Sequence, residues 1–217
     1  MAERKSPERK SSDERRDEIV RSTLRIVAAK GFAGVTLRDV ANDVGVVHGL
    51  IRHYFSSRDD LVAAAFDFAV TSELASDRAL LDGLNPVAAL AGWLAATPED
   101  HYRVWIDAWS EAERTPALAA ALDRHHRDCE AILARVIERV VDAGLGASAD
   151  PAVDARLLTA VADGVAVQHH AVGIIGVNEA NAIVYSVAER QLALEPGILA
   201  RANPVPARGN WAVAPAR

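Results

Sequence analysis

The chain has 217 residues, half of them hydrophobic, and a formal net charge of −6 at pH 7. This size can bury a core of one or two domains, and the scarcity of alternating β-branched runs favours an all-helical fold. A single cysteine excludes an intrachain disulfide and suits the reducing cytoplasm. No apolar run reaches the roughly 18 residues of a membrane span, and the charged N-terminus lacks the apolar core of a signal peptide.

The charge is distributed unevenly along the chain. Residues 1–62 contain 12 Lys and Arg against 10 Asp and Glu, whereas the remainder contains 12 against 20. A mildly basic N-terminal region on an acidic remainder is typical of a protein that presents one end to DNA. Residues 1–12 are polar and charged, and we expect a disordered tail, with a basic arm that reaches DNA as the alternative.

The first predicted helix covers residues 13–30. Gly31 can end this helix, and Phe32 can plug the core of a small three-helix unit. The apolar side of the helix comprises Ile19, Leu24, Ile26 and Val27. We expect this helix to support a recognition unit rather than to read bases itself.

Residues 36–58 contain two short predicted helices joined by a tight turn. Thr36 can cap the first helix with its hydroxyl, Asp39 completes a variant of the capping box, and Gly45 can end the helix in a left-handed conformation. The second helix, 48–55, turns Ile51, Tyr54 and Phe55 inward and His48, Arg52 and His53 outward. This is the signature of a helix-turn-helix, and its outward donors suit a phosphate-lined DNA groove.

The stretch GVTLRDVANDVGVVHGLIRHYFSSRDDL, with KGF before it, resembles the DNA-binding domain of the TetR family of bacterial repressors. The resemblance runs from about Arg15 to Leu61. GLIRHYF and the later RVWIDAWSEAERTPAL also resemble the subgroup of choline-responsive repressors of betaine synthesis. The resemblance implies a DNA-binding domain at 13–60 and a ligand-binding and dimerisation domain of about six helices at 61–194.

The resemblance also implies which residues contact DNA. They are Thr36, Arg38, Val47, His48, Gly49, Arg52, His53, Tyr54, Ser57 and Arg58. Thr36 and Arg58 would bind phosphate, and Val47 leaves the second helix without a side-chain cap. Arg52 could bind guanine bidentately, with a phosphate contact or a salt bridge to an acid as the alternatives. His48 stands where lysine is frequent, so that one charge becomes dependent on pH.

Further helices are predicted at 57–78, 86–95, 99–114 and 115–143, the last two separated by Thr115-Pro116. Thr97 is expected to cap the third of them, with Pro98 at its first position. Aromatic residues gather on one side of that helix, at Tyr102, Trp105 and Trp109, with Trp93 nearby. They are either core packing or the wall of a cavity for a flat ligand or a quaternary ammonium.

The candidate ligand-binding residues are Trp93, Tyr102, Trp105, Trp109, His125, Cys129 and His169. His125 and Cys129 lie four residues apart, a spacing that can hold a metal, although two ligands do not make a metal site. Core packing of a histidine and a small cysteine is the alternative. We expect no metal, no cofactor and no enzymatic activity.

The last helices are predicted at 151–173 and 178–193. Both are apolar over most of their surface, so they must be buried inside the subunit or against a partner. The resemblance implies that they form the interface of a homodimer. Residues 195–217 contain four prolines and are expected to be an irregular tail, on which Trp211 could dock.

These features predict a ligand-responsive transcriptional regulator, a repressor that binds a pseudo-palindromic operator as a homodimer and is released by a small molecule. The resemblance implies that the ligand shifts the helix at 57–78 and changes the spacing of the two DNA-binding ends. The alternatives are a small-molecule- or metal-binding protein or enzyme built on His125 and Cys129, and a nonspecific DNA-compacting protein, against which the acidic remainder argues.

Overall fold

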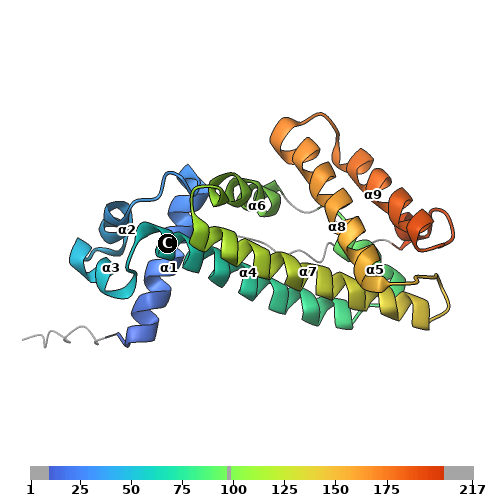
Figure 1. Cartoon of the computed structure of the whole chain (residues 1–217), viewed down its shortest axis with the longest axis horizontal. Coiled ribbons are helices and arrows are strands. Elements are labelled where there is room, and N and C mark those ends of the chain that lie inside the picture. The colour runs from blue at the N-terminus through green and yellow to red at the C-terminus, as the bar shows by residue number, and fades with distance from the viewer. Residues whose placement is uncertain (1–9, 97–98, 203–217) are drawn as a thin grey trace, which may run out of the picture.

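The computed structural model describes residues 10–96 and 99–202, and in that part of the chain it contains helices and no strand. A head at one end consists of α1 (Ser12–Lys30), α2 (Leu37–Val44) and α3 (His48–Tyr54). From the head, α4 (Arg58–Asp82) and α7 (Pro116–Asp142) run side by side along the molecule (Figure 1). The all-helical prediction is confirmed.

The other helices build the body against this pair. They are α5 (Pro86–Leu94), α6 (Glu99–Ala112), α8 (Pro151–Ala166), α9 (Val177–Gln191) and the short α10 (Ile198–Arg201), with a π-helical segment η1 (Val167–Val172) continuing α8. Figure 1 shows α6 between the head and α8, and α8 and α9 rising at the far end. No helix in the described ranges is long and apolar enough to cross a membrane.

Capping side chains set the helix ends in the head. Ser11 and Glu14 form a full capping box, so α1 begins at Ser12, one residue before the predicted start. The Thr36 hydroxyl accepts the Asp39 N–H at 3.1 Å, as predicted. The Asp39 carboxylate instead lies 3.3 Å from Nζ of Lys30 rather than completing a second box. Gly45 ends α2 with φ 74° and ψ 35°, the left-handed conformation that glycine adopts at least cost.

The same chemistry sets the ends of the body helices. Ser57 caps α4 by accepting the Asp60 N–H at 3.0 Å, and α4 continues to Asp82, one turn beyond the predicted end. Asn85 caps α5 and Asp150 caps α8, each followed by proline at the first helical position. The predicted cap at Thr97 and Pro98 lies outside the described residues.

Two segments differ from the sequence prediction. The single helix expected at 151–173 changes to π-helical winding at Val167 and ends at Gly173, which has φ 68°. The expected irregular tail begins with a turn of helix, α10, whose Leu199 is fully buried. The arm at residues 1–9 and the remaining tail with Trp211 lie outside the described residues.

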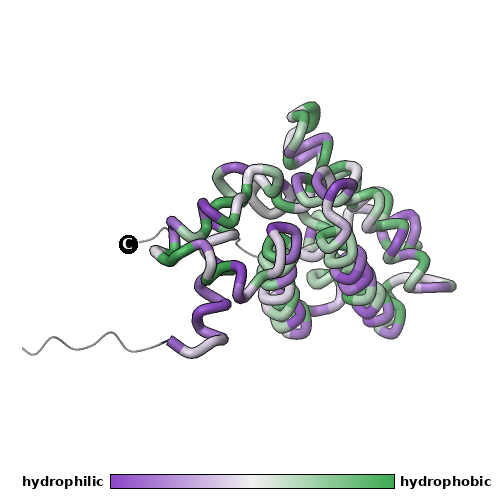
Figure 2. The backbone as a smooth tube through the Cα atoms, turned by 60° about the vertical axis from the view of Figure 1, so that its left-hand side comes forward, coloured by the Kyte–Doolittle hydropathy of each residue, from purple (hydrophilic) through white to green (hydrophobic). Residues whose placement is uncertain are grey.

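One hydrophobic core joins the head to the body. The fully buried Phe66 of α4 packs edge-on against Phe32 of the head, 6.1 Å between ring centroids, and against Trp105 of α6, 5.2 Å. Phe32 therefore plugs the core as predicted. The turn between η1 and α9, at the top of the molecule, is by contrast hydrophobic and exposed (Figure 2).

Candidate DNA-binding surface and ligand pocket

The outer face of α3 is open to solvent while its inner face anchors the helix. Ile51 is fully buried and Phe55 is 3% exposed, so the helix is fixed against the head. The exposed residues are Val47, His48, Gly49, Arg52 and His53. Val47 is the N-cap and makes no side-chain cap bond, as predicted. A short rigid helix with its outer residues free is the geometry by which a helix-turn-helix enters the major groove.

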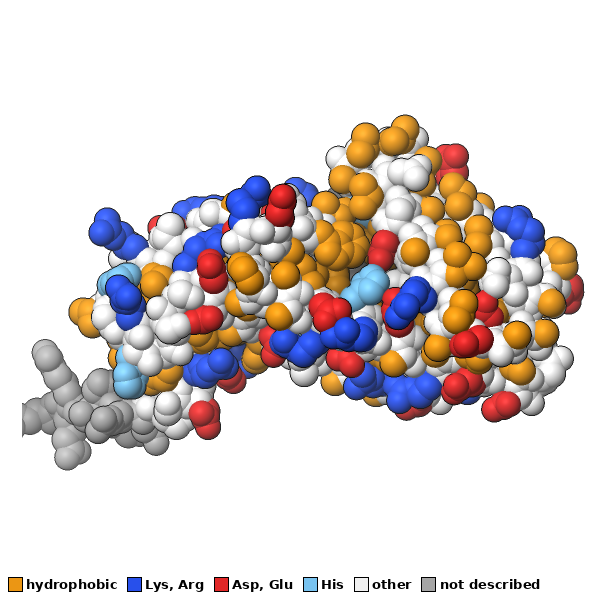
Figure 3. All heavy atoms as spheres, viewed as in Figure 1, with side chains coloured by type: hydrophobic (Ala, Val, Ile, Leu, Met, Phe, Trp, Pro, Cys, Tyr) orange, Lys and Arg blue, Asp and Glu red, His pale blue; other side chains and the backbone are white. Residues whose placement is uncertain are grey.

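One acid of the head, Asp43 of α2, is engaged by the head's own donors. Asp43 accepts hydrogen bonds from the Ser22 hydroxyl at 2.6 Å and from Arg25 at 2.5 Å. These two bonds hold the pKa of Asp43 below its usual value, so it stays ionised and paired. Arg38 and Arg52 are exposed and form no ion pair with an acid in the described part of the chain. The positive charge at this end, visible at the left of Figure 3, therefore remains available to phosphate.

Arg58 does not face outward with the other predicted DNA contacts. Its guanidinium donates to the carbonyl of Val35 at 3.2 Å and to the carbonyl of Phe32, and it forms an ion pair with Glu111 at 2.9 Å. These bonds direct the side chain into the junction between head and body. In this structure Arg58 connects head and body, and it does not lie with the exposed residues of α3 to which the family resemblance adds it.

Thr36 and Ser57 are both N-caps, so each hydroxyl oxygen accepts a backbone N–H of its own helix. The hydroxyl proton of each stays available to an external acceptor such as phosphate. Tyr54 is half-buried, and His53 packs edge-on against its ring with 5.3 Å between centroids. Thr36, Tyr54 and Ser57 therefore lie at the ends of α2, α3 and α4.

In the body, a small cavity that we call the aromatic hollow lies between α6, α7 and α8. Its lining residues are Tyr102, Trp105, Trp109, His126, Cys129, Thr159 and Asp163. The cavity volume is about 10 Å³, which is the space of one water molecule. The Thr159 hydroxyl is buried in the wall without a hydrogen-bond partner in the described structure. Aromatic faces beside a carboxylate suit a cation.

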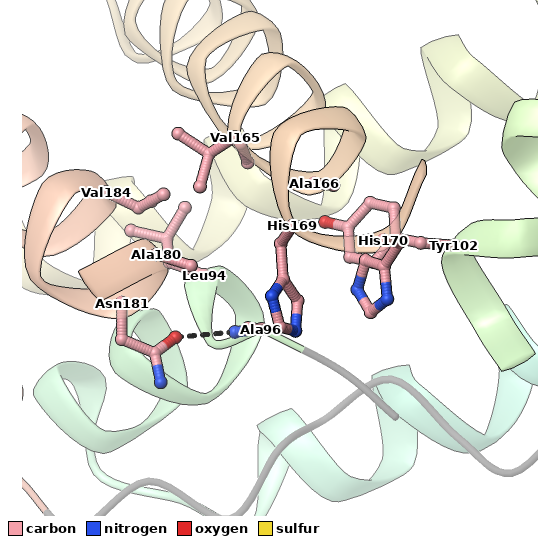
Figure 4. A pocket seen from close by; sticks show the side chains of 11 residues that line it. Leu94, Ala96, Tyr102, Val165, Ala166, His169, His170, Ala180, Asn181 and Val184 are labelled. Carbon is pink, nitrogen blue, oxygen red and sulfur yellow. Dashed lines mark hydrogen bonds between the residues drawn. The ribbon is translucent and has the colours of Figure 1, made fainter. Parts of the chain in front are cut away.

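A second cavity of similar size, the histidine hollow, adjoins it across Tyr102. It is lined by the η1 histidines, Asn181 and apolar residues of α5, α8 and α9 (Figure 4). His170 stacks on Tyr102 with 5.2 Å between ring centroids. Nδ1–H of His169 donates to the carbonyl of Ile175 at 2.9 Å, and the Asn181 side-chain oxygen accepts the Ala96 N–H at 2.7 Å. The π-helical winding brings both histidines to this end of α8.

The structure brings together part of the predicted ligand set. Tyr102, Trp105, Trp109 and Cys129 share the aromatic hollow, and His169 lines the histidine hollow. Trp93 and His125 line neither. Trp93 is core, with 2% of its surface exposed.

His125 is instead part of a link between α7 and α4. Its Nε2–H donates to the Asp67 carboxylate at 2.9 Å, which also accepts from Arg124, and its ring packs edge-on against Phe66. Burial raises the pKa of Asp67, but the hydrogen bonds from Arg124 and His125 outweigh burial and leave that pKa lowered. His125 is thus buried at the contact between α7 and α4 and does not line the aromatic hollow.

Sequence reasoning missed Thr159 and Asp163 as pocket residues. They lie four apart on one face of α8, in the part of the helix after Arg156 that is otherwise apolar or glycine, and that spacing was the available signal. His126 and Asn181 were also outside the predicted set. Their placement depends on how α7 and α9 pack, which the periodicity of a single helix does not contain.

Family models match most of the chain. Residues 19–65 match the bacterial regulatory proteins of the tetR family, and residues 85–193 match the C-terminal region of BetI-type transcriptional repressors. The regulator PksA of Bacillus subtilis is 33% identical over 72 residues, 33% of this chain and 34% of that protein. BetI of Paraburkholderia phytofirmans is 28% identical over 112 residues, 48% of this chain and 57% of that protein. The chain thus spans between a third and somewhat over half of these relatives' length.

Solved structures share the fold. A transcriptional regulator from Saccharomonospora viridis, in complex with choline, superposes with a TM-score of 0.74 at 21% identity, covering 85% of this chain and all of that one. The multidrug-binding protein EbrR, complexed with proflavin, gives a TM-score of 0.61 at 24% identity over 82% of this chain and all of that one.

The two matched regions correspond to the two parts of the structure: residues 19–65 to the head with its exposed α3, and residues 85–193 to the body with its hollows. The matched families and the named relatives are transcriptional regulators and not enzymes. The chain therefore belongs to the TetR family of bacterial regulatory proteins, with a C-terminal region of the BetI type.

Proposed function

We propose that this protein is a transcriptional repressor that binds a pseudo-palindromic operator as a homodimer and is released by a small organic cation. The single observation that carries the DNA-binding part is the outer face of α3, where exposed donors stand on a helix fixed by Ile51 and Phe55. Bacterial transcription takes place in the cytoplasm, which is where we place the protein.

The contacts we assign to DNA follow from exposure. Arg52 and His48 lie on the face of α3 that would enter the major groove. Gly49 is exposed on the same helix, and because it has no side chain the backbone there could approach DNA closely. Arg38, with Thr36 and Ser57 at the starts of their helices, would position the head on phosphates. Arg58 is left out of this set because its guanidinium is engaged within the molecule.

A second copy of the chain is the proposed partner of α8 and α9. Large apolar side chains stay exposed along these two helices and the turn between them: Val153, Leu157, Val172, Ile174, Val177 and Ile183. Figure 3 shows hydrophobic side chains gathered over this end of the molecule. Solvent-exposed apolar patches of this kind mark protein interfaces. A two-fold dimer would present one α3 to each of two successive major grooves.

The aromatic hollow supports a cationic effector. Trp105, Trp109 and Tyr102 provide aromatic faces, and the carboxylate of Asp163 lies in the same wall. The S. viridis regulator of similar fold holds choline, a quaternary ammonium, and EbrR holds proflavin, a flat cationic ring system. Because the hollow has room for about one water, any such ligand must displace its walls. A ligand that moves the walls can change the affinity for DNA, and by linkage DNA changes the affinity for the ligand equally.

The test is selection of bound duplexes from a random pool at about physiological salt, with the wild type and with Arg52→Ala. The wild type should enrich a palindrome whose half-sites are about one helical turn apart, roughly 34–36 Å. If Arg52 binds guanine, Arg52→Ala should relax one base position per half-site and weaken the site by about 1–3 kcal/mol. If it binds phosphate, the variant should weaken all sequences evenly. Failure of the wild type to enrich any sequence would contradict the proposed function.

A further inference from the structure

The residue before the first turn of α3 is an apolar side chain that the head leaves in solvent. Val47 is 76% exposed, the largest fraction among the exposed large hydrophobic side chains of the described ranges. Its neighbour Val46 is partly buried and packs against the core. Single exposed apolar residues are common on protein surfaces, so exposure alone assigns no role to Val47.

The side chain of Val47 does not serve the start of its own helix either. The backbone carbonyl of Val47 accepts the N–H of Leu50 at 2.9 Å, but the side chain makes no capping bond. Serine, threonine, aspartate and asparagine are preferred as N-caps because their side-chain oxygen accepts an N–H of the first turn, whereas valine is among the poorest. The N-caps of α1, α2 and α4 are such residues, Ser11, Thr36 and Ser57. Val47 therefore contributes its side chain neither to the core nor to a cap.

The position of Val47 indicates what its side chain meets when DNA is bound. In a helix-turn-helix, the N-terminal residues of the recognition helix contact base edges, and Val47 lies at that end of α3. His48 and Arg52 follow it as exposed residues that can donate hydrogen bonds. The apolar surface proposed for the dimer lies on α8 and α9, at the opposite end of the molecule (Figure 1). The proposed dimer surface therefore does not include Val47.

The major groove offers an apolar group that suits such a side chain. Thymine places its C5-methyl group in this groove, whereas the other features of the base edges are hydrogen-bond donors and acceptors. Valine has no polar side-chain atom with which to bond to those edges, and its two methyl groups are held by a stiff χ1 torsion. Contact between valine and a C5-methyl group removes apolar surface of both from water, which is favourable.

We propose that Val47 reads the C5-methyl group of a pyrimidine in each half-site of the operator. This inference rests on the proposed function and deepens it, because it adds a specificity-determining residue that acts through apolar contact. The base is thymine in unmodified DNA, and 5-methylcytosine carries a methyl group on the same ring carbon. An operator with cytosine at this position would therefore bind more tightly once that cytosine is methylated.

The first test removes only the methyl group from the DNA. Each thymine of the selected operator is replaced in turn by deoxyuridine, which pairs with adenine in the same way but lacks the C5-methyl group. At one thymine position per half-site, the wild type should bind about fourfold more weakly, the loss expected for one buried methyl-sized group. Replacement in both half-sites should weaken binding roughly tenfold to twentyfold. Unchanged binding at every replaced thymine would overturn the proposal.

Variants of Val47 test whether its side chain makes the contact with that methyl group. Val47→Ser removes both methyl groups of valine and should bind the thymine and deoxyuridine operators equally. Val47→Ile is the matched control, because it keeps a branched apolar side chain and should keep the wild-type preference for thymine. The readout is the ratio of two affinities for each variant, so a general loss of affinity cancels. A Val47→Ser variant that keeps the full preference would contradict the assignment to Val47.

The response to methylation is tested at the same position. The thymine–adenine pair is replaced by a cytosine–guanine pair, with or without a C5-methyl group on the cytosine. The wild type should bind the methylated duplex about fourfold more tightly for each half-site changed. Val47→Ser should bind the two duplexes equally. Equal binding of both duplexes by the wild type would show that Val47 does not read a C5-methyl group.

A measurement without DNA tests whether Val47 has a structural role instead. Val47→Ser supplies the missing capping hydroxyl, so it should raise the midpoint temperature of thermal unfolding. Leu145→Ser changes another exposed apolar residue, in the loop between α7 and α8, and should give no such rise. A lower midpoint for Val47→Ser would show that the head requires valine here, against the proposal.

The outcomes separate this inference from the proposed function. If the wild type selects no operator, the proposed function fails and the reading of a methyl group fails with it. If the wild type selects an operator whose thymines all tolerate deoxyuridine, the proposed function stands and only the role of Val47 is wrong.

Discussion

Arg52 and Arg58 stand six residues apart in one basic motif, yet the fold gives them separate roles. Arg52 is exposed on the outer face of α3. Arg58 is turned inward by two backbone carbonyls and by Glu111, a carboxylate from the far side of the head–body junction. The motif alone could not separate them, because Glu111 comes from 53 positions later in the chain. Both residues carry a guanidinium that can bind phosphate or a carboxylate. The groups that surround each one in the folded chain decide whether it faces solvent or the junction between head and body.

Asp163 is the residue on which the cationic effector proposal depends most directly. We expect Asp163→Asn to weaken binding of choline, used as a probe, roughly fivefold to tenfold, since a partly buried charge pair contributes on the order of 1 kcal/mol. Binding of its neutral isostere 3,3-dimethylbutan-1-ol should not change. Calorimetric titration of both compounds measures this. Asp142→Asn, an exposed acid at the end of α7, is the control. A wild type that prefers the neutral compound would contradict a cation site.

Asp43 offers a pH test of how the head is held. Its folded-state pKa lies below the usual 3.8, so its bonds to Ser22 and Arg25 stabilise the fold fully above about pH 4 and are lost as pH falls through the folded value. Asp43→Asn should therefore lower unfolding free energy at pH 7, and the deficit should shrink by pH 3. Asp43 is partly exposed, so the effect is modest. Denaturant unfolding at both pH values measures it.

The control for that prediction lies on the same helix as Ser22. Asp17→Asn alters an exposed acid whose ion pair with Arg21 is long, at 4.0 Å. The loss of unfolding free energy that Asp17→Asn causes at pH 7 should be small. A deficit of Asp43→Asn that stays constant down to pH 3 would show that its carboxylate is not stabilised by these bonds.

At the scale of the element, capping chemistry explains which boundaries could be predicted. Thr36, Gly45, Asn85 and Asp150 each act locally, and the helices they bound are found within a residue or two of the predicted ends. The π-helical turn at Val167 could not be predicted, because one extra residue per turn leaves the apolar composition of the segment unchanged. The turn of helix at Ile198 depends on docking of Leu199 into the body.

The pocket could be predicted only in part for a related reason. One helix supplied Tyr102, Trp105 and Trp109 at spacings that a sequence displays directly. Two polar residues of the same cavity, Thr159 and Asp163, come from α8, so they join the cavity only once α8 packs beside α6. His125 lies four residues before Cys129 on the inward face of α7, but it bonds to Asp67 of α4 and does not line the cavity. Periodicity identifies the buried face of a helix and does not identify its neighbour.

At the scale of the whole molecule, the chain exposes on α8 and α9 the apolar surface that a buried helix should hide. Leu157 of α8 is 42% exposed, and Ile183 of α9 is 37% exposed. A single chain leaves this surface in water, whereas a second copy would cover it by isologous packing. The exposure of these helices is thus consistent with the sequence expectation that they are buried against a partner.

Leu157→Asp is the direct test of that arrangement. A carboxylate placed at the centre of the proposed interface would be desolvated without a partner, so we expect dimers at micromolar concentration to become monomers in sedimentation velocity. Leu145→Asp is a matched control, because Leu145 is also 42% exposed but lies in the loop between α7 and α8. It should leave the dimer intact. The Leu157→Asp monomer should still bind DNA weakly but lose preference for the paired half-sites, since two linked heads are what make the palindrome bind tightly. A Leu157→Asp variant that stays dimeric would place the interface elsewhere.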